Sequence, residues 1–386
     1  MPLQNGISHI MNVYIVGSHA TGEQNSRIGV ANAIQKLLIN DGLSCRKILT
    51  ASPQKIYRPS ANDETYKLWP DDFPDYERET VKGIPVKLST YAKQLIEENG
   101  DPDIIIHSGG YDKGIKLALA LKLASSRPSF LVNLSHPRTE NYDIFDLVVN
   151  PIESLRRATD FSFKGVSHKV SQEKIDEGIA DWAERLSIFH GRNPVVGVLV
   201  GGTIPNRAGD KEFTEADGEA LGGYIREVIL SYDASVIATN SRRTPTDAWR
   251  AFASQLDIPD AAMLLHDYKS DDAHNPYLAI LGTSDLLIVT ADSRSMLWEV
   301  SATGKPSYAF IAPNQQLESI HVENLEELGK MGMVRTLPED PNRLDFGWKP
   351  KAYNPTSELA AKVISAFQNS RQISAIENSF RMVPGC

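Results

Sequence analysis

Short apolar runs rich in Val, Ile and Leu recur along the chain, and most of them end in a polar or glycine-bearing turn. The clearest runs occupy residues 12–16, 103–107, 129–134, 195–200 and 286–290. Between such runs the apolar positions recur every three or four residues, which is the helical period, for example at 26–38 and 114–124. Continuous apolar runs are typical of strands buried in parallel sheets, and the alternation of strand, loop and helix is that of βαβ units. The pattern predicts an α/β protein.

The alternation lapses between residues 160 and 178, and a second series starts with the run at 195–200. We therefore expect two Rossmann-like domains that face a central cleft, an N-terminal domain over residues 1–190 and a C-terminal domain over residues 191–353. Residues 354–386 contain one more helix and a tail that could pack back on the N-terminal domain.

The run at 286–290 leads directly into the polar turn Asp292–Ser295, and a helical pattern then carries Glu299 towards Gly304. Ligands of open α/β sheets bind beyond the carboxyl ends of the strands, so the free N–H groups at the start of this helix would favour an anion such as a phosphate. Glu299 lies about two helical turns after Asp292 and could accept two hydroxyls of a ribose. The alternative is structural, because Asp and Ser are common N-caps and Gly304 is a common helix end.

Two further polar loops follow apolar runs in the second half. Gly201 and Gly202 close one run, and Ser241, Arg242 and Arg243 follow another. Loops that follow parallel strands gather at one edge of the sheet, so we expect these residues beside the turn at Asp292, on the donor side of the cleft. Guanidinium groups match phosphate oxygens, which favours a diphosphate ligand; the alternative is that the arginines pair with surface acids.

The loop after the first apolar run contains His19 and Glu23, which are candidates for a general base that deprotonates an acceptor hydroxyl. This loop has neither the spacing of a dinucleotide-binding fingerprint nor that of a P-loop. A loop histidine can equally be a solvated or hydrogen-bonded residue. The acceptor side of the cleft is expected to include Gly22, Asn25, Ser108, Gly109 and Arg138.

Composition narrows the class of function. The formal net charge of the 386 residues is −9, which argues against general nucleic-acid binding. Two cysteines, Cys45 and Cys386, are too few for a disulfide framework and indicate a reducing, cytoplasmic environment. No apolar run is long enough for a membrane helix, which leaves only peripheral membrane association open. No metal site is expected, because Asp101-Pro102-Asp103 precedes its strand and so lies at the wrong edge for a donor metal.

Several motifs span nearly the whole chain. They are Gly22-Glu23-Gln24-Asn25, Ser108-Gly109, Pro137-Arg138, Gly201-Gly202, Ser241-Arg242-Arg243-Thr244-Pro245, Asn275-Pro276, and Asp292-Ser293-Arg294-Ser295-Met296 through Glu299 to Gly304-Lys305-Pro306. In this order they resemble the motifs of the mitochondrial-fission ELM-like family. The resemblance implies the two-domain GT-B architecture of nucleotide-sugar glycosyltransferases. It also adds Asn275 and Met296 to the expected donor-binding residues, which already include Ser293 and Ser295 at the helix start.

The leading hypothesis is therefore a metal-independent glycosyltransferase, with a nucleotide-diphosphate sugar as substrate and no further cofactor. Arg242, Arg243 and the helix start at Ser293 and Ser295 would stabilise the departing diphosphate. The acceptor is unknown; a glycolipid or a glycan is a candidate. The alternatives are a non-catalytic adaptor that acts in organelle or membrane dynamics through a protein partner, a nucleotide-sugar epimerase, and a sensor of nucleotide diphosphates.

Overall fold

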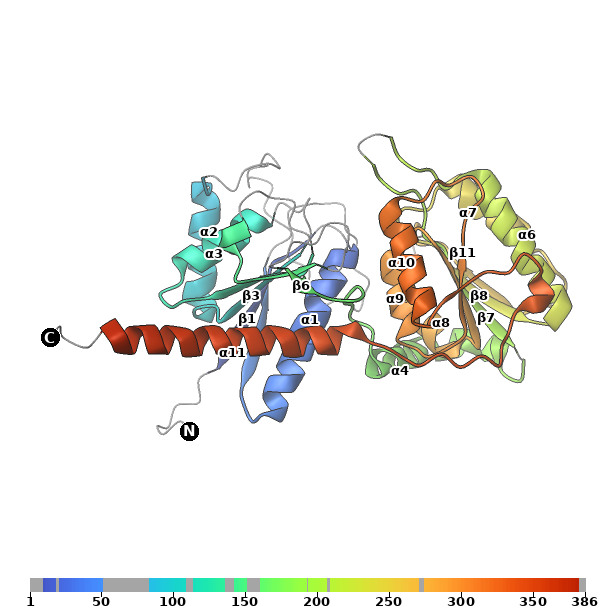
Figure 1. Cartoon of the computed structure of the whole chain (residues 1–386). Helices are drawn as coiled ribbons and strands as arrows, with labels where there is room; N and C mark the ends of the chain where they lie inside the picture. The colour runs from blue at the N-terminus through green and yellow to red at the C-terminus, as the bar shows by residue number, and fades with distance from the viewer. Residues whose placement is uncertain are drawn as a thin grey trace. The chain divides into compact units, whose positions relative to one another are not determined.

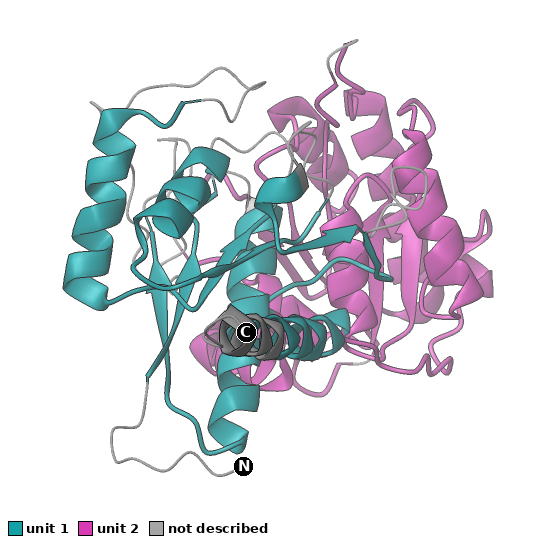
Figure 2. Ribbon diagram, turned by 60° about the vertical axis from the view of Figure 1, so that its left-hand side comes forward, with its two compact units in different colours: residues 1–169, 355–386 teal, residues 170–354 magenta. Residues whose placement is uncertain are grey.

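The structure is a computed structural model of the whole chain. The residues that it describes are 10–18, 21–50, 83–108, 114–135, 142–150, 160–192, 194–206, 209–270 and 274–381. The chain divides into two compact units (Figure 2): unit 1 comprises residues 1–169 and 355–386, and unit 2 comprises residues 170–354.

Unit 1 is a parallel sheet covered by helices on both faces (Figure 1). Its described strands are β1 (Met11–Ile15), β2 (Cys45–Leu49), β3 (Ile104–His107), β4 (Phe130–Asn133), β5 (Leu147–Asn150) and β6 (Phe161–Ser162). Their order in the sheet is β2-β1-β3-β4-β5-β6. The helices are α1 (Thr21–Asn40), α2 (Val86–Asn99), α3 (Ile115–Ala124) and α11 (Pro355–Arg381), with a short 3-10 turn, η1 (Tyr142–Ile144).

Strand β1 shows why both faces of this sheet carry helices. Successive side chains of a strand point to opposite faces. Val13 and Ile15 pack in a cluster with α1 and α11, whereas Tyr14 packs in a second cluster with α2 and α3. All three side chains are at most 2% exposed. Helix α11, at the far end of the sequence, contributes Leu359 and other apolar residues to the first cluster and so belongs to unit 1.

Unit 2 is a second parallel sheet. Its described strands are β7 (Val195–Leu199), β8 (Ser235–Thr239), β9 (Met263–His266), β10 (Leu286–Thr290), β11 (Ser307–Phe310) and β12 (Arg335–Thr336), in the order β12-β11-β10-β7-β8-β9. The helices are α4 (Gln172–Asp181), α5 (Ala183–Leu186), α6 (Glu215–Tyr232), α7 (Thr246–Ser254), α8 (Tyr277–Thr283), α9 (Arg294–Ser301) and α10 (Ser319–Lys330). Two 3-10 turns are η3 (Ser187–Phe189) and η4 (Pro341–Arg343).

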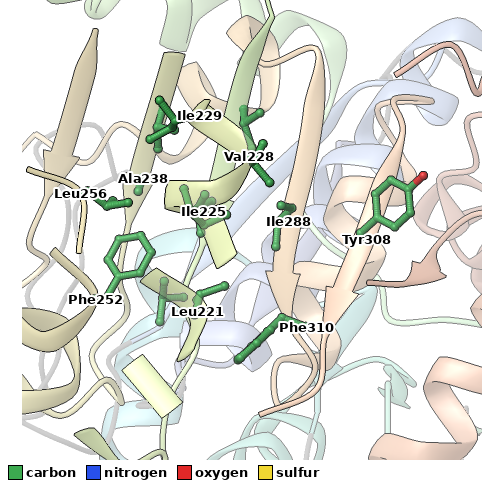
Figure 3. Packing of buried hydrophobic residues seen from close by; sticks show 14 of the residues in the cluster. Leu221, Ile225, Val228, Ile229, Ala238, Phe252, Leu256, Ile288, Tyr308 and Phe310 are labelled. Atoms are coloured by element: carbon green, nitrogen blue, oxygen red, sulfur yellow. The ribbon is translucent and has the colours of Figure 1, made fainter. Parts of the chain in front are cut away.

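One apolar core joins helices α6 and α7 to the sheet of unit 2 (Figure 3). Leu221 and Ile225 of α6 and Phe252 of α7 are fully buried in it, together with Ile288 of β10. Helix α6 begins with a capping box, in which Thr214 and the side chain of Asp217 bond each other's backbone N–H groups. Such a cap contributes about 1 kcal/mol to helix stability, whereas full burial of a single Leu or Ile side chain contributes about 1.5–3 kcal/mol. The buried apolar face therefore stabilises α6 more than its cap does.

Helix α4 explains where unit 2 begins. A methyl group added at Gly178 of α4 would lie 2.6 Å from Cβ of Leu278, and one added at Gly282 of α8 would lie 2.5 Å from Cδ1 of Ile179. Only glycine lets these two helices approach so closely. The segment from residue 170 therefore packs with the second sheet, and the division between the units falls at 169/170, ahead of the boundary at 190/191 expected from the sequence.

The strand orders place a switch point in each sheet. The order from β9 to β12 is that of a doubly wound dinucleotide-binding sheet, in which successive strands are added outward on one side of β7 and then, from β10 onward, on its other side. In unit 1 this change of side lies between β1 and β3. The predicted α/β class with two Rossmann-like halves is confirmed. Ligands of such sheets bind beyond the carboxyl ends of the strands that flank a switch point, so these two edges are where a site is sought.

Candidate functional site

The loops after β7, β8 and β10 are bonded to one another at the switch point of unit 2. The N–H of Gly201 donates to Oγ1 of Thr290 (2.7 Å), and Oγ of Ser241 donates to the carbonyl of Gly201 (2.7 Å). The N–H of Gly202 donates to Oδ2 of Asp292 (2.8 Å). The sequence prediction that these three loops meet at one edge is therefore matched by their hydrogen bonds.

An ion pair between a partly exposed arginine and a buried aspartate lies at this edge. Nη2 of Arg243 is 2.6 Å from Oδ2 of Asp292, whose side chain is fully buried. Nη1 of Arg243 also donates to the carbonyls of Gly202 (3.3 Å) and Thr203 (2.9 Å). The guanidinium is thus engaged within the protein, and its partner is a buried acid rather than a surface one.

The same ion pair accounts for both glycines. A methyl group added at Gly201 would overlap the carboxylate oxygens of Asp292. At Gly202 it would overlap the backbone of Arg243. The backbone φ angle of 156° there is also one that residues other than glycine rarely adopt. The glycine pair is therefore required by packing against Asp292 and Arg243, whether or not a ligand approaches it.

Arg242, the neighbour of Arg243, is in the opposite situation. Its side chain is exposed, and it makes no hydrogen bond or ion pair with any residue that the structure describes. Of the two arginines that the sequence does not distinguish, Arg242 is the one open to a ligand.

Helix α9 begins beside this edge with unused donors. Ser293 is the N-cap residue, yet its side chain makes no capping hydrogen bond. The hydroxyls of Ser293 and Ser295 and the N–H groups of residues 294–296 are not bonded within the described part of the chain. Helix N-termini carry a partial positive charge and bind anions. Met296, which follows Ser295, is half-buried.

Two polar residues that sequence reasoning missed complete this edge. Nε2 of Gln315, in the loop after β11, donates to the carbonyl of Gly202 (3.0 Å). His321 of α10 is buried, and burial followed by the charge of Arg294 lowers the pKa of its imidazole, although Glu318 and Asp292 oppose the shift. The histidine is therefore neutral at pH 7. The only available signal was that both residues follow a strand, β11, that neighbours β10.

Glu299 and Asn275 have structural partners. The Glu299 carboxylate is 5% exposed and accepts a hydrogen bond from the hydroxyl of Tyr277. Burial, followed by the charge of Glu299, raises the pKa of Tyr277 well above its usual range. Oδ1 of Asn275 accepts from the N–H of Tyr277 (2.9 Å), at the start of α8. The ribose role of Glu299 stays a prediction.

The switch point of unit 1 is built on Arg27, a residue that sequence reasoning also missed. Its guanidinium is fully buried and donates to Oγ (2.8 Å) and the carbonyl (2.6 Å) of Ser108 and to the carbonyl of Val16. Oε2 of Glu23 is 3.7 Å from Nη2 of Arg27 and accepts from Oγ of Ser18 (2.9 Å). The side chain of Glu23 is 30% exposed, so a carboxylate reaches the surface at this edge.

The remaining acceptor-side predictions are only partly placed. Gly22 and Asn25 lie in the first turns of α1 and are half-buried. His19, Gly109 and Arg138 lie outside the described residues.

The acidic pair Asp101 and Asp103 lies at the opposite edge of the unit 1 sheet, ahead of β3. Oδ1 of Asp103 is 3.2 Å from a guanidinium nitrogen of Arg371 and 3.6 Å from one of Arg127. Oδ1 of Asp101 accepts from the N–H of Ser126 (2.9 Å). Over the ranges described, no group of three or more His, Cys, Asp or Glu could hold a metal ion. No helix among those residues is both long and apolar enough to cross a membrane.

Comparison with known proteins gives a family and a fold. Residues 21–367 match the family model described as Mitochondrial fission ELM1. Mitochondrial fission protein ELM1 of Arabidopsis thaliana is 24% identical over 309 residues, which cover 73% of this chain and 67% of the plant protein. An uncharacterized protein of Rickettsia prowazekii is 24% identical over 300 residues, covering 69% and 80% of the two chains.

Two solved structures share the fold at low identity. The UDP-GlcNAc 2-epimerase of Methanocaldococcus jannaschii has a TM-score of 0.55 and 12% identity, and covers 93% of this chain and 100% of that one. The UDP-GlcNAc 2-epimerase of Neisseria meningitidis, bound to UDP-GlcNAc, has a TM-score of 0.54 and 11% identity, and covers 93% and 99%. The predicted GT-B-like fold class and the family resemblance are both confirmed.

Proposed function

The chain belongs to the mitochondrial fission ELM1 family, and from this premise we propose that unit 2 binds a nucleotide-diphosphate sugar whose sugar the protein transfers to an acceptor hydroxyl. A glycolipid or glycan would be the acceptor. The proposal calls for no metal ion, because backbone N–H groups and a guanidinium can stabilise the departing diphosphate.

The observation that carries the proposal is the set of unused donors at the switch point of unit 2. The N–H groups of residues 294–296 and the hydroxyls of Ser293 and Ser295 have no partner within the described ranges. The exposed guanidinium of Arg242 belongs to the loop after β8, which is hydrogen-bonded to the loop after β7. Donors at a helix start beside a switch point match a diphosphate, whose oxygens accept several hydrogen bonds at once.

The other residues of this edge have supporting roles in the proposal. The ion pair of Arg243 with Asp292 holds the loops after β7, β8 and β10 together, so that the donors stay in place before a ligand arrives. Such preorganisation lowers the free-energy cost of binding. Glu299 is the candidate for the ribose hydroxyls. Solved structures support only the class of ligand, a nucleotide sugar, because the Neisseria enzyme of similar fold is bound to UDP-GlcNAc.

The transfer step needs a base, and Glu23 of unit 1 is the described candidate. The acceptor oxygen attacks the anomeric carbon, the bond from that carbon to the diphosphate oxygen breaks, and the hydroxyl proton passes to the Glu23 carboxylate. The electron pair leaves on the diphosphate. Ser18 and Arg27 orient this carboxylate, and its 30% exposure gives a substrate access to it.

The test is thermal stabilisation of the full chain by UDP-, GDP-, ADP- and CMP-linked sugars and by the free nucleotides. A ligand at about 100 times its dissociation constant adds about 2.7 kcal/mol of stability. We expect one nucleotide series to stabilise the protein and Arg242→Ala to weaken its binding by about 1.5–3 kcal/mol, as lost charge-assisted hydrogen bonds do. Arg250→Ala is the matched control, because Arg250 is an equally exposed arginine on α7. Equal affinity of both variants would remove the diphosphate role of Arg242.

Two other functions, an epimerase and a non-catalytic adaptor, are distinguished by this stabilisation experiment together with an assay of the products formed from the bound nucleotide sugar. The two solved structures compared above are both UDP-GlcNAc 2-epimerases, and this likeness makes an epimerase the second candidate. An epimerase converts the bound donor without any acceptor, so a new nucleotide sugar formed by the protein alone would identify it. A protein that no nucleotide stabilises would instead be the non-catalytic adaptor.

A further inference from the structure

A hollow of about 360 Å³ lies at the other edge of the unit 2 sheet, away from the donors of α9. Asp285, which immediately precedes β10, and Pro306, which immediately precedes β11, both line it. Its volume is within the range of small-molecule sites, about 300–1,000 Å³.

Lys305 supplies a cation to this hollow. Its Nζ donates to the carbonyls of Gly282 (2.5 Å) and Ser284 (2.7 Å), where helix α8 ends. Burial lowers the pKa of this ammonium to about 8, although the charge of Asp285 opposes the shift. An ammonium has three N–H groups and the two carbonyls use two of them. The third remains for a group inside the hollow that Lys305 lines.

Another part of the lining is aromatic and basic. Phe346, Trp348 and Lys349 form it, and Lys349 is exposed. The guanidinium of Arg335 lies 3.9 Å from the centroid of the Trp348 ring, and this cation–π contact fixes the ring. The acid of the hollow is already engaged, because Oδ2 of Asp285 accepts from the N–H of Val195 (2.8 Å). Two lysines, Lys305 and Lys349, against the single Asp285 give the lining a net positive charge beside its flat apolar surface.

We propose that this hollow is a second ligand site that takes a small organic anion, a carboxylate or a phosphate on a flat apolar body. The anion bonds Lys305 and Lys349, and the body packs against Phe346 and Trp348. The site is independent of the proposed function, because no residue of it contributes to the edge at α9.

The experiment titrates the full chain with benzoate, phenyl phosphate and the neutral benzyl alcohol. It measures the heat of binding by calorimetry and the NMR signal of the Trp348 indole N–H. We expect at least one anion to bind and to shift this signal, and benzyl alcohol to bind at least tenfold more weakly. Benzoate alone would identify a carboxylate ligand, and phenyl phosphate alone a phosphate. Binding should weaken as pH rises from 7 to 9, because Lys305, whose pKa burial lowers to about 8, loses its positive charge over this range.

Variants locate the anion. Lys349→Met should weaken binding severalfold, whereas Lys351→Met should not, because Lys351 is an exposed lysine two residues away that does not line the hollow. Lys305→Met should abolish binding. If the Lys305→Met protein does not fold, the Lys349→Met protein still tests the proposal. Arg242→Ala should leave benzoate affinity unchanged. Absence of binding, equal affinity for benzyl alcohol, or equal loss in Lys349→Met and Lys351→Met would each overturn the proposal.

Discussion

The two switch points each contain an internally bonded arginine, but they hold it in different ways. In unit 2, Arg243 pairs with the fully buried carboxylate of Asp292 at 2.6 Å. In unit 1, Arg27 is fully buried but donates to neutral oxygens of Ser108 and Val16, and Glu23 lies 3.7 Å away with 30% of its side chain exposed. The carboxylate of unit 2 is thus part of the framework, whereas that of unit 1 reaches the surface.

The difference assigns a different chemistry to each edge. Because Asp292 is neutralised by Arg243, the groups left open in unit 2 are donors: the helix start at Ser293 and the guanidinium of Arg242. Such an edge favours an anion. The edge of unit 1 instead offers a carboxylate, Glu23, held by Ser18 and Arg27, which can accept a proton. An anion-binding edge and a proton-accepting edge are the two requirements of the proposed transfer reaction.

The largest predicted effect is the difference in stability loss when the charge of each carboxylate, Asp292 or Glu23, is removed in turn. Asp292→Asn leaves Arg243 without its counter-ion and should destabilise unit 2 by about 3 kcal/mol, near the low end for a broken buried pair because 26% of the arginine side chain is exposed. Glu23→Gln breaks a longer, partly exposed pair and should destabilise unit 1 by less than about 1 kcal/mol. Hydrogen exchange of the β7 and β1 amides reads the two units separately.

Asp345→Asn is the control for the first substitution. Asp345 pairs with Arg335 at 3.4 Å, but both side chains are about half exposed, so its loss should change stability by less than about 1 kcal/mol. If Asp292→Asn were as mild as Asp345→Asn, the ion pair of Arg243 would not hold the loops of unit 2 together.

A smaller effect is predicted for the glycine that makes room for Asp292. The methyl group of Gly201→Ala would overlap the carboxylate oxygens, and overpacking of this kind costs about 1–3 kcal/mol. Gly223→Ala in α6 is the matched change, since nothing lies within 4 Å of the added methyl group. It should be neutral or slightly stabilising. Urea unfolding followed by tryptophan fluorescence measures both, because four of the five tryptophans, Trp182, Trp249, Trp298 and Trp348, lie in unit 2. Equal midpoints for the two variants would mean that Asp292 moves aside freely.

The fold was predictable from the sequence because buried parallel strands and amphipathic helices each leave a local pattern. The roles of individual residues within the site were less predictable from the sequence. Arg242 and Arg243 are adjacent and identical in type, and only the path of the chain decides that one is bonded internally and the other is exposed. Gly201 suggests a ligand loop, yet its neighbour is Asp292, far away in sequence.

Residues that act through distant partners left no local signal. Arg27 occupies an ordinary helical position, and its hydrogen bonds to Ser108 depend on the pairing of β1 with β3. Lys305 stands in the sequence only as a member of the Gly304-Lys305-Pro306 motif, and its carbonyl partners at Gly282 and Ser284 belong to the end of another helix. Long-range contacts of this kind require the three-dimensional arrangement.

The smallest predicted effect is a difference in acid sensitivity between the units. Burial, followed by the Arg294 charge, lowers the pKa of His321 in unit 2, so the unfolded chain binds more protons as pH falls below about 6.5, and stability is lost across that window. In unit 1, burial alone would raise the pKa of Asp101, but hydrogen bonds from Ser126 and Ser125 and the Arg127 charge lower it, so that stability is lost only as pH falls below the usual carboxyl range. Exchange of the β7 amides should therefore accelerate between pH 7 and pH 5, after correction for intrinsic rates, while that of the β1 amides stays constant. His321→Gln should flatten the response of unit 2, and an unchanged slope in that variant would assign the acid sensitivity to another group.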